Sequence, residues 1–407
     1  MKLSDIAIFV TDKVSSRDIS IEDYITTDCI LQNKKGRVVA ANLPPKPCSL
    51  TRYQTGDVLI ANIRPYLKKI WYADRSGGAS SDVLVLRAKE NHSPAFLYSF
   101  LLQDSFFDYI MLGTKGSKMP RGDKSQIMRY ETPFSPKSEE DIGKFFLLLN
   151  NLIVLNESIN NNLEALANLI YDFWFVQFDF PDENGRPYKS SGGKMVWNEM
   201  LKRDIPATWT TSIVKDVIKP LERGISYASE NISSPNGWPM INLACYSKQG
   251  DYREGEMKYY SGTIKETDKA FPYDMLIACT DMTQDADVIG RPILASEEFE
   301  WYVYSMDLAK ITPDNIQKMY LYYTLRTPFY HKYIKPFASG TNVKHLNVLG
   351  VENYKIPIPP ISLQTKFEVL ISNIKKQQML IINENKEIIK ERDDLLPLLM
   401  NGQVSLK

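Results

Sequence analysis

Basic side chains gather around glycines in residues 113–129, GTKGSKMPRGDKSQIMR. The stretch holds five basic residues and one acid, namely Lys115, Lys118, Arg121, Lys124, Arg129 and Asp123. A loop with glycines can bring backbone N–H groups close to phosphates, while Lys and Arg reach phosphate oxygens or guanine edges. The stretch is therefore a candidate nucleic-acid contact, and a solvated surface loop is the alternative.

A second candidate, residues 62–73 (NIRPYLKKIWYA), interleaves basic and aromatic side chains. The basic residues Arg64, Lys68 and Lys69 alternate with the aromatic residues Tyr66, Trp71 and Tyr72. Aromatic rings beside cations are typical of nucleic-acid binding. The same rings could equally be core residues of a strand, and both interpretations stay open.

Residues 339–347, SGTNVKHLN, form a third candidate late in the chain. Asn342, Lys344 and His345 supply hydrogen-bonding groups beside a Gly-Thr pair. The acidic stretch 279–287, CTDMTQDAD, could also meet base edges through Asp281, Thr283 and Gln284. An Asp-rich turn is the favoured interpretation of that stretch.

Signatures of catalysis are missing from the sequence. It contains no G-x-G-x-x-G, G-x-x-x-x-G-K-[ST], G-x-S-x-G or H-E-x-x-H pattern, and no Asn/Asp-Pro-Pro-aromatic signature of amino-methyltransferases. Four widely spaced cysteines and three histidines argue against a disulfide framework and against zinc sites of standard spacing. We therefore expect a protein without catalytic site or metal.

The composition is that of a globular protein of two to four domains, since 407 residues at ~100–200 per domain exceed one core. Lys plus Arg and Asp plus Glu number 49 each. A zero net charge excludes coating of nucleic acid by charge alone but allows a local basic face. The N-terminus does not resemble a signal peptide, and the most apolar stretch, 145–155, is short for a bilayer. We expect a cytoplasmic protein without membrane contact.

The sequence repeats internally. A shift of 224 residues superposes Gly116 on Gly340, Tyr130 on Tyr354, Pro133 on Pro357, Pro136 on Pro360 and Ser138 on Ser362. The same shift places Arg121 opposite His345. GDVLIANIRP (56–65) aligns with YDMLIACTDM (273–282) at a slightly different offset, as loop insertions would produce. The chain is therefore expected to hold two related halves.

A long helical pattern follows the first repeat. Apolar residues recur at alternating intervals of three and four residues, and Asn156 occupies the one polar position in the series. The apolar members are Ile142, Phe145, Leu149, Leu152, Ile159, Leu163, Leu166 and Ile170. This is a heptad seam. Ser138 with Asp141 three residues later predicts the N-cap.

A second helical pattern closes the other half. Phe367, Ile374, Ile381, Ile388 and Leu395 recur at intervals of seven. Polar Gln377, Glu384 and Glu391 occupy the other seam position, Thr365 with Glu368 predicts a capping box, and Pro397 with Gly402 predicts the end.

Two heptad seams in one chain favour pairing of the two helices, because each alone would expose an apolar stripe to water. Packing of each helix on its own neighbouring domain is the alternative. The chain is predicted to be α+β: two globular α/β domains separated by two long antiparallel coiled-coil helices, with pseudo-twofold symmetry. The expected segments are domain 1–136, helix 137–178, a Gly/Pro-rich linker 179–204, domain 205–360, helix 361–400 and tail 401–407.

In combination, these motifs resemble those of the specificity subunits of type I restriction-modification systems. The resemblance rests on GDVLIANIRPYLKKIW, GTKGSKMPRGDK, LIYDFWFVQFDFPDENGRPYKSSGGKMVWNE, SGTNVKHLN and the closing LLPLLMNGQV. It covers essentially the whole chain. The linker and C-terminal motifs are much more specific than the heptads.

The resemblance implies two target recognition domains that bind double-stranded DNA at a bipartite asymmetric site, with the helices as a ruler. It implies docking of two methyltransferase subunits and of restriction subunits. S-adenosylmethionine, ATP and Mg would then be bound by those partners, with no cofactor in this chain, in a bacterial or archaeal cytoplasm. A self-sufficient methyltransferase or nuclease, and a coiled-coil scaffold without DNA, remain as alternatives. S-adenosylmethionine binding by the isolated chain would favour the enzyme.

Overall fold

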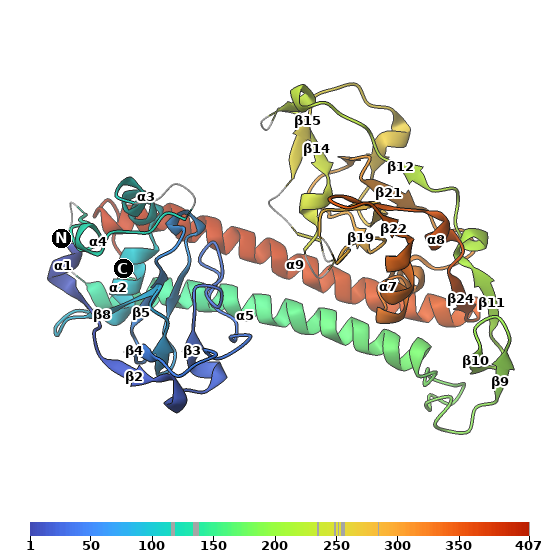
Figure 1. Cartoon of the computed structure of the whole chain (residues 1–407), viewed down its shortest axis with the longest axis horizontal. Helices are drawn as coiled ribbons and strands as arrows, with labels where there is room; N and C mark the ends of the chain where they lie inside the picture. Colours follow the sequence, from blue (N-terminus) through green and yellow to red (C-terminus); the bar gives the residue numbers. More distant parts are fainter. Residues whose placement is uncertain are drawn as a thin grey trace. The chain divides into compact units, whose positions relative to one another are not determined.

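The structure, a computed structural model, describes residues 1–406 apart from 115–118, 133–137, 234–235, 248–249, 251, 254–256 and 284. The chain divides into two compact units (Figure 1). The first unit is Met1–Asn161 with Leu380–Lys407, and the second is Asn162–Met379. Each unit has its own sheets and its own hydrophobic core.

Two four-stranded sheets form the first unit. One sheet has the order β1-β8-β5-β6, made of Ala7–Phe9, Val83–Ala88, Val58–Ala61 and Ile70–Tyr72. The other has the order β2-β4-β7-β3, made of Lys13–Ser15, Ser49–Tyr53, Gly77–Ala79 and Tyr24–Ile25. The unit also contains the short helices α1 (Leu3–Ile6), α2 (Pro94–Leu102), α3 (Asp104–Leu112) and α4 (Lys124–Ile127).

The second unit has one four-stranded sheet and one five-stranded sheet. The first has the order β12-β21-β17-β19, made of Glu222–Arg223, Leu308–Ile311, Met275–Ala278 and Pro292–Leu294. The five-stranded sheet β13-β15-β14-β20-β16 consists of Ile232–Ser233, Lys258–Tyr260, Trp238–Ile241, Tyr302–Tyr304 and Lys269–Ala270.

Smaller sheets and three short helices complete this unit. The small sheets are β18-β23-β22 (Thr280–Asp281, Lys344–Leu346, Ala338–Ser339), β9-β10 (Met195–Asn198, Arg203–Pro206) and β11-β24 (Thr210–Ile213, Lys355–Ile358). The helices are α6 (Lys318–Thr324), α7 (Pro328–Ile334) and α8 (Leu349–Glu352).

The two halves repeat in structure as they do in sequence. Strands β5 and β17, the aligned runs VLIA and MLIA, are buried along their whole length and stand third in sheets of matching order. The turn before each strand is also repeated: the carboxylates of Asp57 and Asp274 each accept from a backbone N–H three residues earlier, at 2.9 Å. Gly56 and Tyr273 both have positive φ there, +90° and +64°.

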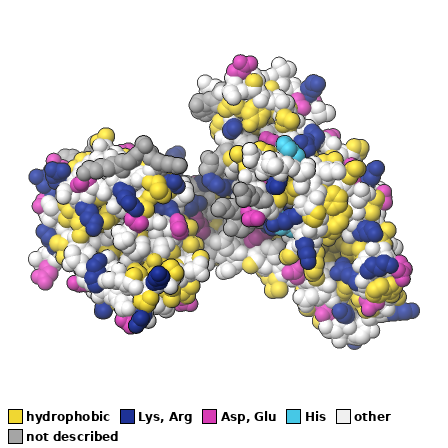
Figure 2. All heavy atoms as spheres, viewed as in Figure 1, with side chains coloured by type: hydrophobic (Ala, Val, Ile, Leu, Met, Phe, Trp, Pro, Cys, Tyr) yellow, Lys and Arg dark blue, Asp and Glu magenta, His cyan; other side chains and the backbone are white. Residues whose placement is uncertain are grey.

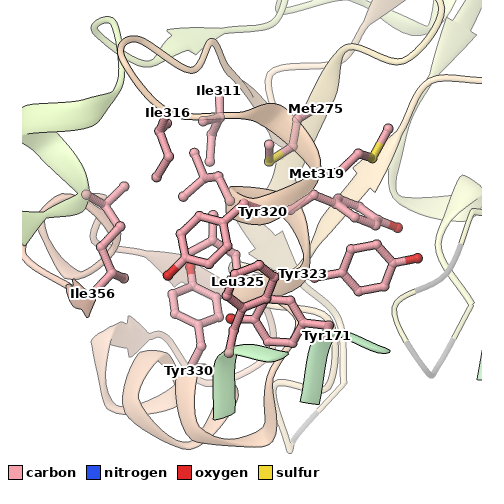
Figure 3. Close-up of a cluster of buried hydrophobic side chains, with 14 of the residues drawn as sticks. Tyr171, Met275, Ile311, Ile316, Met319, Tyr320, Tyr323, Leu325, Tyr330 and Ile356 are labelled. Carbon is pink, nitrogen blue, oxygen red and sulfur yellow. The ribbon is translucent and has the colours of Figure 1, made fainter. Parts of the chain in front are cut away.

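Short helices rich in aromatic residues cover the sheets. In the second unit, Tyr320 and Tyr323 of α6, Tyr330 of α7 and Tyr171 point into one buried cluster (Figure 3). Their hydroxyls are satisfied locally; Tyr320 donates to the Pro357 carbonyl at 2.6 Å. Tyrosine can be buried at such a site because a partner compensates the loss of water.

The two long helices are α5 (Glu139–Tyr171, continued by a π-turn at Asp172–Val176) and α9 (Ile361–Met400). In the first unit the start of α5 shares a core with the end of α9, through Phe146 and Leu399. In the second unit Tyr171, at the end of α5, packs on Phe367, near the start of α9, with ring centroids 6.0 Å apart. Each unit thus contains an antiparallel helix pair, and the predicted fold class is confirmed.

The expected register of the seam is only half right. In α5, Ile142 is buried and Phe145, Leu149, Asn156, Leu163 and Ile170 are half-buried, but Leu152, Ile159 and Leu166 are exposed. In α9, Phe367 and Ile374 are buried, and Ile381, Ile388 and Leu395 are half-buried. The second seam position lies one residue later than predicted in both helices.

The residues that do fill this second position are Phe146, Ile153 and Ala167 in α5, and Ile371, Gln378, Asn385, Arg392 and Leu399 in α9. Three of these α9 residues are polar. The apolar pattern could not identify them, because their burial depends on hydrogen-bonding partners from other segments.

Two predicted helix ends also need correction. Helix α9 begins at Ile361, four residues before the expected capping box, and Thr365 Oγ1 donates back to the Ile361 carbonyl at 2.9 Å. Glu368 instead accepts from the backbone of Met319. Pro397 lies inside the helix. The N-cap at Ser138 agrees with the prediction, since its Oγ accepts from the Asp141 N–H.

The stretch expected as a linker is ordered by its own side chains. The carboxylate of Asp179 accepts from the N–H and Oγ of Ser190 at 2.7 and 2.6 Å. The ring of Phe180 stacks on Tyr188, with centroids 4.7 Å apart. The segment then forms the β9–β10 hairpin.

By length and composition, one described helix, Glu139–Val176, is apolar enough to cross a membrane. Within that stretch most of the buried side chains are apolar, and so are several of the exposed ones. This double apolar character accounts for the hydropathy without a membrane, and a single such helix is weak evidence for one.

Candidate nucleic-acid interface

The fold brings the first two candidate stretches together. Ile63 and Arg121 form a β-bridge, and the N–H of Arg64 donates to the Pro120 carbonyl at 2.8 Å. Arg64 has a left-handed backbone (φ +54°), which turns the chain at the start of the 3-10 helix Pro65–Leu67. The side chains of Arg64 and Arg121 are both exposed. Two basic residues that are 57 positions apart in the sequence therefore lie on adjacent backbone.

Arg121 has one acidic partner, Asp82, at 3.0 Å, and both side chains are more than 40% exposed. Such a pair contributes little to stability and can exchange for another anion. Lys124 is exposed at the start of α4, which Asp123 caps by accepting from the Gln126 N–H. Lys115 and Lys118 lie outside the described residues.

Lys68 is less available than the sequence suggested. Its ammonium lies 2.9 Å from Asp104, which also binds the buried Lys34 at 2.8 Å. Burial by itself would raise the pKa of Asp104, but the hydrogen bonds from Lys34 and Lys68 lower it below its usual value. Neighbouring Lys69 donates to the Thr27 carbonyl at 2.5 Å, and burial lowers its pKa.

The aromatic residues of the second stretch have different roles. Trp71 is 7% exposed and packs edge-on against Tyr53, so the core interpretation holds for it. Tyr72 is half-buried beside Tyr98. Tyr66 is 49% exposed and stands next to Arg64 in sequence. Only Tyr66 is placed so that a base could stack on it.

The second unit repeats this bridge with different side chains. Thr280 pairs with His345 and Asp281 with Lys344, as Ile63 pairs with Arg121 in the first unit. Asn342 and His345 are exposed, whereas Lys344 is half-buried and donates to the Gly340 carbonyl at 2.8 Å. Gly340 has φ +118°, and a Cβ there would lie 2.1 Å from the Val343 carbonyl oxygen. This loop needs glycine to present its polar groups.

The acidic stretch forms the turn that the sequence favoured. Asp281 is 2% exposed, and its carboxylate accepts from the N–H groups of Thr283 and Val288, both at 2.7 Å. Its acceptors are therefore used to hold the loop that follows β18. Gln284 lies outside the described residues, and Met282 is 76% exposed.

A basic group that the sequence reading did not single out lies on α7 and beside it. Arg291, Arg326, Lys332 and Lys335 line one hollow with His331. His331, Lys332 and Lys335 are spaced for one side of a helix, which is a weak signal in the sequence. Arg291 and Arg326 are remote in the chain, and only the fold brings them close.

Charges of both signs are mixed on the face of the protein that Figure 2 draws. On the face in Figure 2, Lys and Arg side chains are interspersed with Asp and Glu. The zero net charge therefore reflects mixing, and recognition must depend on local groups. Among the described residues, no group of three His, Cys, Asp or Glu side chains is placed to hold a metal.

Comparison with known proteins identifies the class. Residues 206–391 match the family model "Type I restriction modification DNA specificity domain". The chain is 23% identical to the type I restriction enzyme MjaIX specificity subunit of Methanocaldococcus jannaschii, over 89% of this chain and 81% of that one. It is 22% identical to the HindI specificity subunit of Haemophilus influenzae, over 94% of both.

A solved structure shares the fold. The type I restriction-modification S subunit from M. genitalium superposes with a TM-score of 0.59 at 14% identity, covering 98% of this chain and 95% of that one. Residues 206–391 therefore belong to the DNA-specificity domain family of type I restriction-modification systems. Over most of its length the chain is similar to type I specificity (S) subunits, which are noncatalytic.

Proposed function

We propose that this S subunit reads a bipartite, asymmetric DNA site with two unlike recognition domains, residues 1–136 and 205–360. The helical segments 137–178 and 361–400 set the distance between the half-sites, and 179–204 links them. The observation that carries the proposal is the repeated bridge. The same bridge joins Ile63 to Arg121 in one unit and Thr280 to His345 in the other, so an exposed arginine of one domain is replaced by an exposed histidine in the other.

Equal backbones with unequal side chains should read different bases. In the first domain we assign DNA contacts to Arg64, Arg121 and Lys124. We assign them also to Lys115 and Lys118, which precede Arg121 in the sequence. In the second we assign them to Asn342, Lys344 and His345. Arg can bind guanine through two hydrogen bonds, whereas Asn can do so with adenine, so the half-sites should differ. We also assign a phosphate contact to Lys68. Its ammonium would have to leave Asp104 in order to reach DNA.

We also propose that α5 binds the methyltransferase subunits through an apolar stripe on the face turned away from α9. Its members recur at three or four residues, apart from one interval of seven between Ile159 and Leu166, and are each at least 38% exposed: Leu148, Leu152, Leu155, Ile159, Leu166, Leu169 and Phe173. An exposed apolar stripe of this kind marks a protein interface. Restriction subunits would join the complex through the methyltransferases.

This division assigns the chemistry to partners. S-adenosylmethionine, ATP and Mg would be bound by the methyltransferase and restriction subunits, and the complex would act in the cytoplasm, where its DNA is. The chain itself would hold no cofactor. S-adenosylmethionine binding by the isolated chain would contradict this assignment.

Mapping methylated adenines in cells that express this chain with its methyltransferase subunits tests the proposal directly. We expect one motif with two different half-sites and a spacer of fixed length. Substitutions at Arg64 and Arg121 should change one half-site and leave the other intact. A single continuous motif, or changes in both half-sites at once, would overturn the proposal.

A further inference from the structure

A hollow of about 350 Å³ opens between α7 and the loop that follows β18, entirely within the second unit. Its lining is Arg291, Arg326, Pro328, His331, Lys332 and Lys335. Five of these six side chains are basic. They come from the loop, from the residue before the Thr327 cap of α7, and from α7 with the turn after it.

Hydrogen bonds hold the inner part of the hollow in place. Arg291 Nη2 lies 2.9 Å from His331 Nδ1, and His331 Nε2 lies 3.3 Å from the Ala286 carbonyl oxygen. Arg can only donate and a carbonyl can only accept, so Nδ1 accepts, Nε2 donates and the imidazole is neutral. Burial lowers the pKa of His331, and the charges of Arg291 and Lys335 lower it further.

Positive charge exceeds negative charge around the hollow among the described side chains. Asp287 lies 4.0 Å from Lys335, at the limit of an ion pair. Glu164 lies 3.7 Å from Arg326 but binds Lys375 at 2.5 Å, so its charge is shared. Lys332 adds a further cation, and Arg291 lies in the inner wall bound to His331. The charges of Lys332 and Lys335 would attract an anion to the hollow.

The equivalent helix of the first unit has the opposite charge. The 224-residue shift places Asp104 and Asp108 of α3 on Pro328 and Lys332 of α7. Asp104 is occupied by Lys34 and Lys68, and Asp108 is exposed. The basic hollow is therefore a property of one half only and not of the common fold.

The hollow adjoins the surface assigned to DNA. Asp281 of β18 pairs with Lys344 of β23, and its carboxylate fixes the loop that leads to Ala286 and Arg291. Tyr330 of α7 donates to the Gly290 carbonyl at 3.1 Å, which attaches the other end of this loop to α7. One loop thus connects the base-reading candidates with the basic hollow.

We propose that this hollow binds a phosphate group, supplied by the DNA backbone beside the half-site of the second domain. Lys332 and Lys335 would pair with the phosphodiester, while Arg291 and His331 form the inner wall. The inference rests on the proposed DNA-reading function. It predicts that the second domain contributes more of the salt-dependent DNA affinity than the first domain does.

The test uses the assembled methyltransferase and DNA that carries its motif. Lys332→Ala/Lys335→Ala is compared with wild type and with Lys355→Ala, an exposed lysine of β24 in the same unit. Affinity is measured across a salt series. Each lost phosphate contact should reduce the slope of log K against log salt by about 0.9. The conservative variant Lys332→Arg/Lys335→Arg should keep the wild-type slope, and Lys355→Ala should not change it.

A second arm distinguishes the source of the phosphate. Inorganic phosphate is titrated into the same complexes without DNA, and binding is followed by calorimetry. A lowered DNA slope with phosphate binding absent or weak supports the proposal. Tight phosphate binding that the double variant abolishes, with an unchanged DNA slope, would assign the hollow to a free anion and overturn it. No effect in either arm would overturn it as well.

Failure of this inference can be separated from failure of the proposed function. If the wild-type complex binds its motif and only the hollow variants lack an effect, the hollow alone is misassigned. The reciprocal change Asp108→Lys offers an independent check. It should steepen the salt dependence if α3 and α7 face DNA in the same way, and an unchanged slope would contradict the shared orientation.

Discussion

Asn156 of α5 donates from Nδ2 to Oδ1 of Asn385 of α9, and the two atoms lie 3.0 Å apart. Asn385 in turn donates to the Ile153 carbonyl at 3.2 Å. This pair, formed by the half-buried Asn156 and the buried Asn385, is satisfied at one alignment of the two helices and loses its partners at others. It therefore sets the register of the helix pair within the first unit.

Replacing Asn385 with leucine should destabilise this unit, because the Asn156 amide and the Ile153 carbonyl lose a partner. We expect the free energy of unfolding to fall by ~1–2 kcal/mol, measured by urea unfolding of the chain. A double-mutant cycle with Asn156→Ala and Asn385→Ala isolates the pair. A coupling energy below ~0.3 kcal/mol would show that the two amides act independently.

Acid should weaken the helix pair of the second unit through Glu164. Burial raises the pKa of this carboxyl, but Lys375, Arg326 and hydrogen bonds outweigh it, so the pKa is lowered. A lowered folded-state pKa gives stability that is complete above the unfolded value, about 4.3, and is lost as pH falls through the folded value. Glu164→Gln should cost roughly 2 kcal/mol at neutral pH.

The difference between wild type and Glu164→Gln should shrink as pH falls below about 5, because protonation makes the two side chains alike. Unfolding by urea at several pH values measures this. Glu157→Gln, which removes a more exposed pair with Lys35, is the matched control and should show a smaller effect. A constant difference down to pH 3 would refute the assignment.

Arg121→Ala/Lys124→Ala should weaken DNA binding by the assembled methyltransferase and flatten its salt dependence. If each side chain neutralises one phosphate, the slope falls by up to about 1.8. Asp82→Ala should act in the opposite direction, since it releases Arg121 from its carboxylate partner. Equal slopes for wild type and both variants would remove this loop from the DNA surface.

Insertion of one heptad into each helix should lengthen the spacer between the half-sites by about three base pairs, since seven helical residues add ~10.5 Å and a base pair spans ~3.4 Å. The insertions belong after Asn161 in α5 and after Met379 in α9, where the two units divide. Methylation mapping gives the spacer directly. A variant that still methylates the original motif would exclude a ruler.

Serine in place of Leu148, Leu155 and Leu169 should weaken binding of the methyltransferase subunits with little effect on folding. These side chains are 55–61% exposed, so the folded chain loses little burial. Co-purification and titration of the partner subunits measure the effect, and Val404→Ser in the tail is the control. Normal assembly of the triple variant would place the interface elsewhere.

The local features of the fold could be predicted from the sequence. The aligned runs at 57–61 and 274–278 become equivalent strands, since an apolar run bounded by turn residues forms the same element in both halves. The expected helix pair is present as well. Individual contacts were harder to predict. Lys68 was expected to contact DNA, but it pairs with Asp104, and the sequence did not indicate this pair because the two residues are 36 positions apart.

By itself, the sequence determined that this protein has two related α+β halves, two long amphipathic helices and a noncatalytic DNA-specificity class. Periodicity, turn residues and motifs are short-range and can be read directly. Only the tertiary structure decided that Gln378, Asn385 and Arg392 are buried in α9, and that Arg291 meets His331 beside α7. Burial of a polar group depends on partners from distant segments, and no local pattern specifies them.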